Sequence, residues 1–454
     1  MNRMRTLVSL LALVLLLPGA ALAVNTGGAD FTTYVAAGDS LTAGFMSDSL
    51  IDVSQKRSYP AIIAGQAGVS VFELPLVSPP GIPGILTLQG LFPTVIAPSP
   101  GQGTPENLNY PGLYNDLAVP GETLNTMLTV KSDTQIPPFK PGLHDLILRG
   151  LGTQIELVVA SKPTFVTLWI GNNDALGAAT SGNVNLLTPV ATFQTEYQTI
   201  VGAIAQTGAK MAIANIPDVT SIPFVTTIPP VLVNPQTNQP VVINGNLVPL
   251  IGPKGLLGPG DHVLLSASAV LAQGIGIPVQ AGGTGLPLPA SVVLLAADAA
   301  TINAQVQQFN TIIEAAASQA GAAYVDINSL LQELSTTGIE VGGIPFIADF
   351  LTGGVFSYDG VHPTAFGYAF IANTFIDAIN AKFGGAIPEA DLATAMFVPE
   401  SAGSPAEIGS LEAGRAALHQ AIWTRYLFTE AATKNLEPIL VPPATTGGKP
   451  HHHR

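Results

Sequence analysis

Short apolar runs with the composition of buried β-strands alternate along this chain with longer segments of helical periodicity. The strand-like runs are residues 31–37, 69–77, 165–170, 210–216 and 322–327. The helix-like segments are residues 59–68, 122–130, 143–161, 188–206, 292–320 and 364–381. Strands separated by helical stretches of this length predict an α/β domain with a mostly parallel sheet covered on both faces. In such sheets the functional residues lie beyond the carboxyl ends of the strands.

Two apolar insertions interrupt this alternation, at about residues 74–110 and 219–291. They are rich in Pro and Gly, and long stretches of both carry no charge. Recurrent Pro and Gly break helices, so the insertions are poor candidates for membrane spans. Asn244-Gly245, between two short apolar runs, predicts a hairpin with a type I′ turn. The insertions are interpreted either as core-forming elaborations of the domain or as an apolar lid or acyl-binding surface.

The N-terminus has the pattern of a secretory signal peptide over residues 1–23. Arg3 and Arg5 precede an apolar run over residues 7–17, and Ala21-Leu22-Ala23 supplies small residues for cleavage after Ala23. The alternative is an uncleaved N-terminal anchor. We therefore expect a secreted or periplasmic protein.

Charge and cysteine content narrow the choice of partners and chemistry. The net charge of −14 becomes −16 once Arg3 and Arg5 are removed, so nucleic acid is not expected as a partner. The chain has no cysteine, which excludes disulfides, thiolate metal sites and a cysteine nucleophile.

Ser40 follows the first strand-like run directly, in the sequence Gly38-Asp39-Ser40-Leu41. This placement puts a hydroxyl and a backbone N–H at the carboxyl edge of the sheet, as a nucleophile requires. The alternative is that Asp39 or Ser40 only caps a helix.

Asp359 and His362 lie three residues apart in a turn rich in Gly and Pro. That spacing lets the carboxylate hold one imidazole nitrogen while the other accepts a proton from serine. A turn carboxylate beside an ordinary surface histidine is the alternative.

Two further stretches end beside Gly121 and Asn173. Residues 115–121 read Asn-Asp-Leu-Ala-Val-Pro-Gly and are interpreted as the end of a strand closed by Pro-Gly. Residues 169–174 read Trp-Ile-Gly-Asn-Asn-Asp and end the strand expected over residues 165–170. A backbone N–H and a side-chain amide are typical donors to a tetrahedral oxyanion. A turn glycine and an Asx turn or helix cap are the corresponding structural interpretations.

Taken together, these four blocks resemble those of the SGNH, or GDSL-type, hydrolases, in the family's order over about residues 31–384. The resemblance implies a three-layer α/β/α, flavodoxin-like fold with about five strands, and hydrolysis without a metal or cofactor. It also implies that Ser40, His362 and Asp359 form a catalytic triad. The Ser40 and Gly121 N–H groups and the Asn173 amide would form the oxyanion hole.

The sequence is therefore interpreted as an exported serine esterase or lipase that acts on esters with an apolar acyl chain. The hydrolase domain is expected at residues 24–385, and a C-terminal helical extension with a flexible tail at residues 386–454. The partner would be a lipidic ester, with transient contact to a lipid surface through the insertions. Lysophospholipase, thioesterase or acyltransferase activity on the same fold is an alternative, and so is a non-catalytic lipid-binding surface protein.

The other histidines are expected to have no role in the reaction. His144 and His419 are interpreted as solvated or capping residues on helices, and His262 as part of a polar loop, with a lid contact as the alternative. The terminal residues 451–453 are three histidines and are assigned no function. Trp169 is expected in the core.

Overall fold

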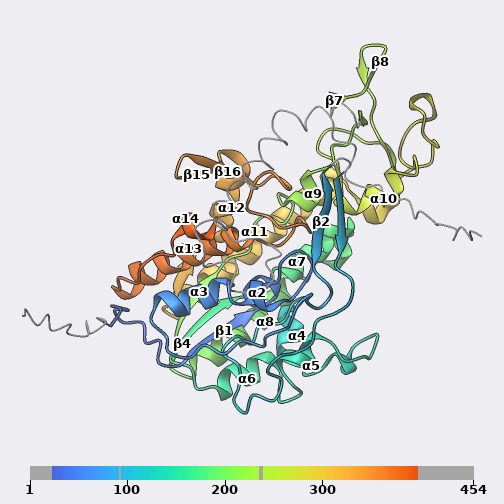
Figure 1. Cartoon of the computed structure of the whole chain (residues 1–454). Helices are drawn as coiled ribbons and strands as arrows, with labels where there is room; N and C mark the ends of the chain where they lie inside the picture. The colour runs from blue at the N-terminus through green and yellow to red at the C-terminus, as the bar shows by residue number, and fades with distance from the viewer. Residues whose placement is uncertain (1–22, 92–93, 235–238, 397–454) are drawn as a thin grey trace, which may run out of the picture.

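Four parallel strands form the central sheet, in the spatial order β1-β4-β5-β14 (Figure 1). Their bounds are Tyr34–Gly38 for β1, Phe165–Trp169 for β4, Lys210–Ala214 for β5 and Ala323–Val325 for β14. Gly38, the last residue of β1, lies opposite Trp169, the last residue of β4, so both strands end at the same edge. The structure is a computed structural model that describes residues 23–91, 94–234 and 239–396.

The position beside the free edge of β1 is occupied by residues 115–119. Ala36 and Asp116 form a parallel bridge, and the Val119 N–H donates to the Gly38 carbonyl at 3.2 Å. This segment takes the place of a fifth strand, so the prediction of about five strands corresponds to four strands and one bridged segment. With it, the order matches the flavodoxin-like arrangement 2-1-3-4-5.

The prediction of a strand over residues 69–77 is wrong. The place beside β1 is already filled by residues 115–119. Glu73 lies next to that segment: its carbonyl accepts the N–H groups of Asn115 and Asp116, and its N–H donates to the Asn115 side chain. Pro75 has no N–H to donate to a ladder. The segment therefore lies outside the sheet, beside residues 115–116.

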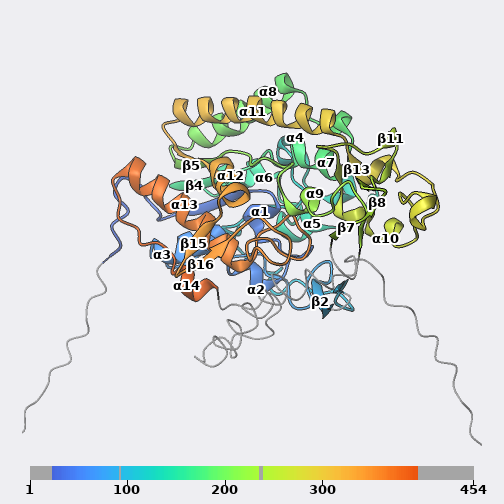
Figure 2. The same ribbon diagram turned by 90° about the horizontal axis from the view of Figure 1, so that it is seen from above.

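Helices cover both faces of the sheet, which confirms the three-layer α/β/α prediction. The helices α3 (Tyr59–Gln66) and α13 (Ala365–Phe383) lie on one face. The helices α6 (Gln154–Ala160), α8 (Val190–Ala205) and α11 (Ala296–Gln319) lie on the other, and Figure 2 shows α8 and α11 across the sheet from α13. Alternate residues of each strand face opposite layers: Tyr34 and Phe165 pack toward α13, while Val35 and Val166 pack toward α8 and α11.

Several helical predictions need adjustment. The single helix expected over residues 143–161 is two helices, α5 (Leu143–Ile147) and α6, because Arg149 and Gly150 adopt left-handed conformations with φ of 55° and 68°. The helices α7 (Asn173–Ser181) and α12 (Ile327–Thr336) were not predicted. The helix α4 (Leu124–Thr129) lies within the predicted residues 122–130. The remaining short helices are α1 (Ser40–Ala43), α2 (Asp52–Gln55), α9 (Pro223–Thr226), α10 (Ser268–Leu271) and α14 (Leu392–Ala395).

Both insertions form small antiparallel hairpins outside the central sheet. The first contains β2 (Leu86–Leu91) and β3 (Thr94–Pro98). The second contains β6 (Val233–Asn234), β7 (Gln239–Pro240), β8 (Val242–Ile243), β9 (Asn246–Leu247), β10 (Ile251–Gly252), β11 (Gly255–Leu256) and β12 (His262–Val263). The strand β13 (Val293–Leu294), which pairs with β12, follows directly, so the helix predicted over residues 292–320 begins only at Ala296. A separate apolar cluster supports the second insertion, made of Leu250, Leu257, Val263, Ala267, Leu288, Val292 and Val293. The β15 (Ile339–Val341) and β16 (Ile344–Phe346) hairpin was not predicted.

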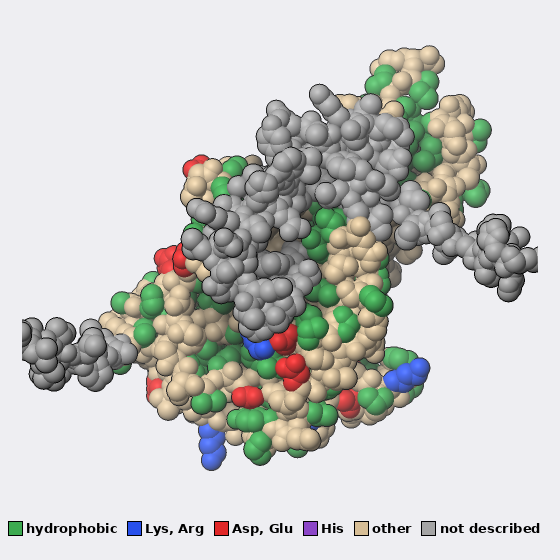
Figure 3. All heavy atoms as spheres, in the orientation of Figure 1, with side chains coloured by type: hydrophobic (Ala, Val, Ile, Leu, Met, Phe, Trp, Pro, Cys, Tyr) green, Lys and Arg blue, Asp and Glu red, His purple; other side chains and the backbone are tan. Residues whose placement is uncertain are grey.

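The predicted type I′ hairpin is confirmed. Asn244 and Gly245 have positive φ of 53° and 81° between β8 and β9, as this turn requires. The hairpin projects away from the sheet (Figure 1). Hydrophobic side chains are visible among the other atoms of this projection (Figure 3).

The ends of the chain are described only in part. The predicted signal peptide, apart from its last residue, and residues 397–454 of the predicted C-terminal extension lie outside the described residues. Residues just after 385 lie against the domain, because Ala386 donates to the Asn25 carbonyl and Asn373 donates to the Ala390 carbonyl. None of the helices in the described ranges combines the length and hydropathy needed to cross a bilayer. The domain boundaries stay a prediction.

Candidate active site

Ser40 lies at the first position of α1, immediately beyond the end of β1. Asp39 caps this helix, and its Oδ1 accepts the Leu41 N–H at 3.0 Å. Gly38 cannot carry a side chain, because a Cβ there would collide with the Trp169 carbonyl and the Thr42 side chain. Buried Gln154 pairs with both backbone groups of Gly38, at 2.9 Å each. Gln154 thus holds the backbone of Gly38 in place, and with it the strand end that carries Ser40.

Ser40, His362 and Asp359 form a continuous hydrogen-bonded line. The Ser40 Oγ lies 2.9 Å from His362 Nε2, and His362 Nδ1 lies 2.9 Å from Asp359 Oδ2. An ionised carboxylate only accepts hydrogen bonds, so Nδ1 carries the proton and Nε2 is the acceptor for the Ser40 hydroxyl. This is the arrangement a serine nucleophile needs.

Asp359 is held by donors from two segments of the chain. Its Oδ1 accepts the N–H groups of Val361 and His362, both at 2.8 Å, and its Oδ2 accepts the Asp48 N–H at 2.7 Å. Burial disfavours the carboxylate, but the charge of His362 and these hydrogen bonds outweigh it, so the pKa of Asp359 is lowered. The carboxylate is therefore ionised when His362 accepts a proton.

The environment of His362 favours its protonated form. Burial lowers the pKa of His362, but the Asp359 carboxylate outweighs burial and raises it above the ordinary 6.5. The Phe45 ring lies 4.9 Å from the imidazole and restricts its orientation. A raised pKa makes this imidazole a stronger base than free histidine.

Gly121 lies in a tight turn next to the end of β1. The Glu122 N–H donates to the Val119 carbonyl at 3.1 Å, and Gly121 has φ of +87°. Val119 itself bonds to Gly38, two residues before Ser40. Gly121 is also two residues beyond Val119, so its turn and Ser40 extend from the same point of the sheet edge.

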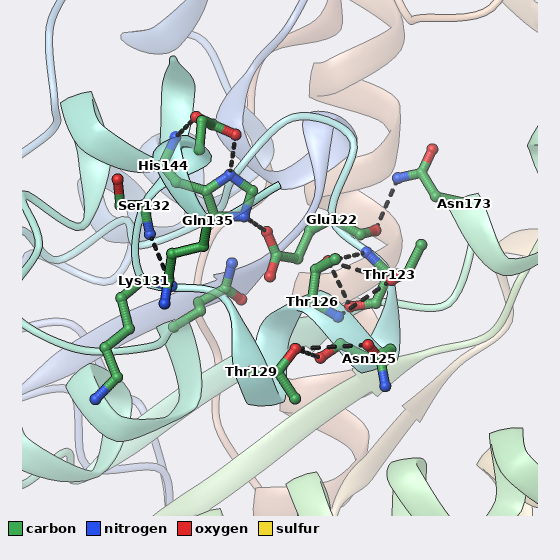
Figure 4. A network of polar contacts seen from close by, with 12 residues as sticks. Glu122, Thr123, Asn125, Thr126, Thr129, Lys131, Ser132, Gln135, His144 and Asn173 are labelled. Atoms are coloured by element: carbon green, nitrogen blue, oxygen red, sulfur yellow. Dashed lines mark hydrogen bonds and ion pairs between the residues drawn. The ribbon is translucent and has the colours of Figure 1, made fainter. Parts of the chain in front are cut away.

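Asn172 and Asn173 connect the segments that carry Ser40 and Gly121. The buried Asn172 amide donates to Asp39 Oδ2 at 2.8 Å, and the Asn173 amide donates to the Glu122 carbonyl at 2.9 Å (Figure 4). Asn173 is the first residue of α7, directly after β4, and its bond to Glu122 uses one of its two amide hydrogens. The structure therefore brings Ser40, Gly121 and Asn173 to one edge of the sheet.

The carboxyl group of Asp39, at the same edge of the sheet, has a raised pKa. It is fully buried, and burial raises its pKa to about 7 against the hydrogen bonds from Asn172 and Leu41. Its charge in turn raises the pKa of His362. Sequence reasoning treated Asp39 only as a cap and gave no role to Asn172 or Gln154, because their partners lie more than 100 residues away.

The prediction for His144 is wrong. Its ring is buried between Asp133 and Glu122, with Nδ1 and Nε2 each 2.8 Å from a carboxylate oxygen, rather than solvated or capping. A tertiary contact of this kind leaves no local pattern in the sequence. Trp169 is buried, as predicted, and donates to the Asn215 carbonyl. His262 lies on β12, partly exposed, and His419 lies outside the described residues.

The chemistry available here is proton transfer by side chains and oxyanion stabilisation by backbone N–H groups and an amide side chain. Within the described ranges, no three His, Cys, Asp or Glu side chains are grouped so as to hold a metal ion. A hydroxyl hydrogen-bonded to an imidazole, beside backbone N–H groups and an amide, is suited to acyl transfer.

Comparison with known proteins identifies one family model. The model described as GDSL-like Lipase/Acylhydrolase matches residues 34–375. The comparison with curated proteins found no match.

Several solved structures are similar at low sequence identity. An extracellular lipase from Streptomyces rimosus is 16% identical, with a TM-score of 0.32 over 77% of this chain and 98% of that chain. A catalytic mutant of an acetylxylan esterase from Geobacillus stearothermophilus is 12% identical, with a TM-score of 0.34 over 77% and 95%. An alpha/beta hydrolase enzyme from the metagenome of Lake Arreo is 13% identical, with a TM-score of 0.34 over 78% and 97%.

Proposed function

The chain belongs to the GDSL-like lipase/acylhydrolase family, a family of carboxylic ester hydrolases with the SGNH fold, and we propose that it uses Ser40, His362 and Asp359 as a catalytic triad. The observation that supports this most is the line of two 2.9 Å contacts from Ser40 Oγ through His362 to Asp359. The matched family residues 34–375 include all three side chains.

The reaction would proceed through an acyl-enzyme. His362 Nε2 takes the proton of Ser40 as Oγ attacks the ester carbonyl, and the carbonyl π electrons move to its oxygen. When the tetrahedral intermediate collapses, the C–O bond to the alcohol breaks and His362 gives its proton to the leaving oxygen. Water then attacks the acyl-enzyme by the same route, and Ser40 recovers its proton.

We further propose that three donors stabilise the oxyanion: the N–H groups of Ser40 and Gly121 and the amide of Asn173. The N–H of Ser40, at the start of α1, lies among the helix donors that have no acceptor within the helix. The contact of Asn173 with Glu122 holds its amide beside the Gly121 turn. One such donor typically lowers the barrier by about 3 kcal/mol.

The proposed substrate is an ester with an apolar acyl chain, encountered at a lipid surface. The support is the composition of the insertions and the side chains they expose: Val242, Ile243, Leu247, Leu256, Val279 and Leu286. These side chains lie on the β8–β9 hairpin, on β11 and in residues 279–286. Exposed apolar side chains of this kind are typical of contact with lipid or another apolar surface. The pattern of residues 1–23 supports export, which the N-terminal sequence of the mature protein would test by starting at Val24.

The test is hydrolysis of p-nitrophenyl esters from acetate to palmitate by the wild type and by Ser40→Ala. We expect activity that rises toward medium or long chains and is abolished in the variant. Activity confined to acetate would keep the triad but overturn the apolar substrate. An active Ser40→Ala variant would overturn the triad, while two folded, inactive proteins that bind fatty acid would favour the lipid-binding alternative.

The same preparation separates the related activities. Lysophosphatidylcholine and palmitoyl-coenzyme A, offered in place of the p-nitrophenyl esters, distinguish a lysophospholipase and a thioesterase from a simple esterase. Methyl ester formation in added methanol measures acyl transfer, because methanol then competes with water for the acyl-enzyme.

A further inference from the structure

A second histidine lies between two carboxylates behind the Gly121 turn. His144 Nδ1 donates to Asp133 Oδ1 at 2.8 Å, and Nε2 lies 2.8 Å from Glu122 Oε2 (Figure 4). The Glu122 side chain is fully buried and that of His144 is 7% exposed. Neither oxygen of Glu122 accepts a well-aligned hydrogen bond from the described residues. The ion pair with His144 is therefore the main compensation for a buried negative charge.

Glu122 is the last residue of the turn that carries the Gly121 N–H. Pro120 at the second position and φ of +87° at Gly121 are the features of a type II turn. In a type I turn the Pro120–Gly121 peptide is turned over, and its N–H points to the opposite side. A shift of Glu122 that relaxes this turn would therefore reorient the N–H.

The same residue also orients the Asn173 side chain. The Glu122 carbonyl accepts one amide hydrogen of Asn173 at 2.9 Å, which leaves the other for a substrate oxygen. Glu122 thus ends the turn that carries one proposed oxyanion donor, the Gly121 N–H, and its carbonyl holds a second, the Asn173 amide. Its side chain is fixed by His144, and His144 by Asp133, whose Oδ2 also accepts the His144 N–H at 2.9 Å.

The charge state of His144 matters because its neighbours are acidic. Burial lowers the pKa of His144, but Glu122 and Asp133 outweigh burial and raise it above 6.5. Asp145, on the same helix, and Asp174, whose carboxylate accepts the Leu124 N–H, are the other acidic groups close to the cluster. The protonated His144 ring therefore has carboxylates near it from three segments. These are Glu122 from the turn, Asp133 from the 3₁₀ helix η1 (Asp133–Gln135) and Asp145 from α5.

We infer that His144, together with Glu122 and Asp133, is a positioning residue that sets the orientation of the Gly121 and Asn173 donors. It touches neither Ser40 nor the substrate, and it acts through Glu122. The inference rests on the proposed function, since it concerns donors assigned there.

The experiment compares His144→Gln, Glu122→Gln/His144→Gln and Asn380→Ala with the wild type, using a soluble p-nitrophenyl ester between pH 6 and 9. His144→Gln leaves the Glu122 carboxylate buried without its counter-charge, so we expect kcat to fall about tenfold toward alkaline pH, with KM little changed. The double variant has no charge to bury, so most of the lost kcat should return and the pH profile should match that of the wild type. Asp174 is present in all of these proteins, so its titration cancels in the comparison.

Asn380→Ala is the matched control for lost stability alone. It removes two hydrogen bonds to Ile387 at the far end of α13, away from the Gly121 turn. A His144→Gln profile parallel to that of Asn380→Ala, or a double variant no better than His144→Gln, would overturn the inference. If His144→Gln does not fold, Asp133→Asn should show a smaller fall in kcat of the same kind, and an unchanged kcat would count against the inference. An inactive wild type, or an active Ser40→Ala, would instead overturn the proposed function on which the inference rests.

Discussion

Replacing Asp39 by Asn should change how the stability of this protein depends on pH. Asp39 is fully buried, and its pKa is raised from 3.8 to about 7. Between these two values the folded protein keeps a proton that the unfolded chain releases, so the free energy of unfolding falls as pH rises. The size of the fall is about 4 kcal/mol, because one pKa unit corresponds to about 1.4 kcal/mol.

The Asn variant should lack this slope and still fold. Its Oδ1 can accept the Leu41 N–H as Asp39 does. Its amide N–H would face Asn172, whose Oδ1 has no hydrogen-bond partner among the described residues and can accept after the amide turns over. We therefore expect the variant to be at least as stable as the wild type at pH 7 and above.

Urea unfolding at several values between pH 4 and 8 measures the effect. The difference in unfolding free energy between the two proteins should change by about 4 kcal/mol across this range, and groups common to both cancel. Asp30→Asn is the control: Asp30 is exposed and its pKa is lowered by hydrogen bonds to Thr32, so the slope should change little and in the opposite sense. Parallel stability curves for the wild type and Asp39→Asn would refute the reasoning. A second readout is kinetic, because losing the Asp39 charge should lower the pKa of His362.

The other predictions concern turnover, pH and packing. Asn173→Ala should lower kcat about 100- to 1,000-fold with an unchanged circular dichroism spectrum, and turnover close to that of the wild type would contradict its role as a donor. The raised pKa of His362 places the acidic limb of kcat/KM above pH 6.5, since the base must be unprotonated, and a pH–rate profile of Asp359→Asn should show this limb at lower pH and a reduced maximum. Phe309→Ala should lower the free energy of unfolding by about 3–5 kcal/mol in urea, because Phe309 is fully buried on α11 and stacks 3.8 Å from Phe193 of α8; a change near zero would contradict this packing. Ser substitutions at Val242 and Leu247 should weaken adsorption to phosphatidylcholine vesicles, measured by sedimentation, while hydrolysis of a soluble acetate ester continues; unaltered adsorption would argue against the β8–β9 hairpin as the lipid contact.

The elements predicted well are those whose local pattern and tertiary role agree. Residues 165–170 form a continuous apolar run, and β4 is buried on both faces. Asn244-Gly245 fixes its turn through φ alone, so two residues suffice to predict the hairpin. The blocks around Ser40 and His362 were also found from sequence, because each lies at a strand end or in a tight turn.

The wrong predictions concern segments whose structure depends on contacts with residues far away in the sequence. Residues 69–77 are apolar enough for a strand, but residues 115–119 fill the place beside β1, and no local pattern distinguishes the two segments. The division between α5 and α6 depends on Arg149 in a left-handed conformation, where its guanidinium reaches the carbonyls of Tyr110 and Gly112. Helical periodicity in a sequence carries no information about the free energy of such tertiary contacts.

This dependence on distant contacts also explains why the residues that support the candidate triad are harder to predict from the sequence than the triad itself. Ser40, His362 and Asp359 carry reactive groups, so chemistry alone makes them candidates. Gln154, Asn172 and His144 are neither nucleophiles nor neighbours in sequence of the groups they hold. Each is also buried, where an unpaired polar group costs more than in water. The groups they hold are the backbone of Gly38, the cap Asp39 and the turn residue Glu122. All three lie within two residues of Ser40 or Gly121, which is why the buried polar side chains of this protein are the place to look for what sets its turnover.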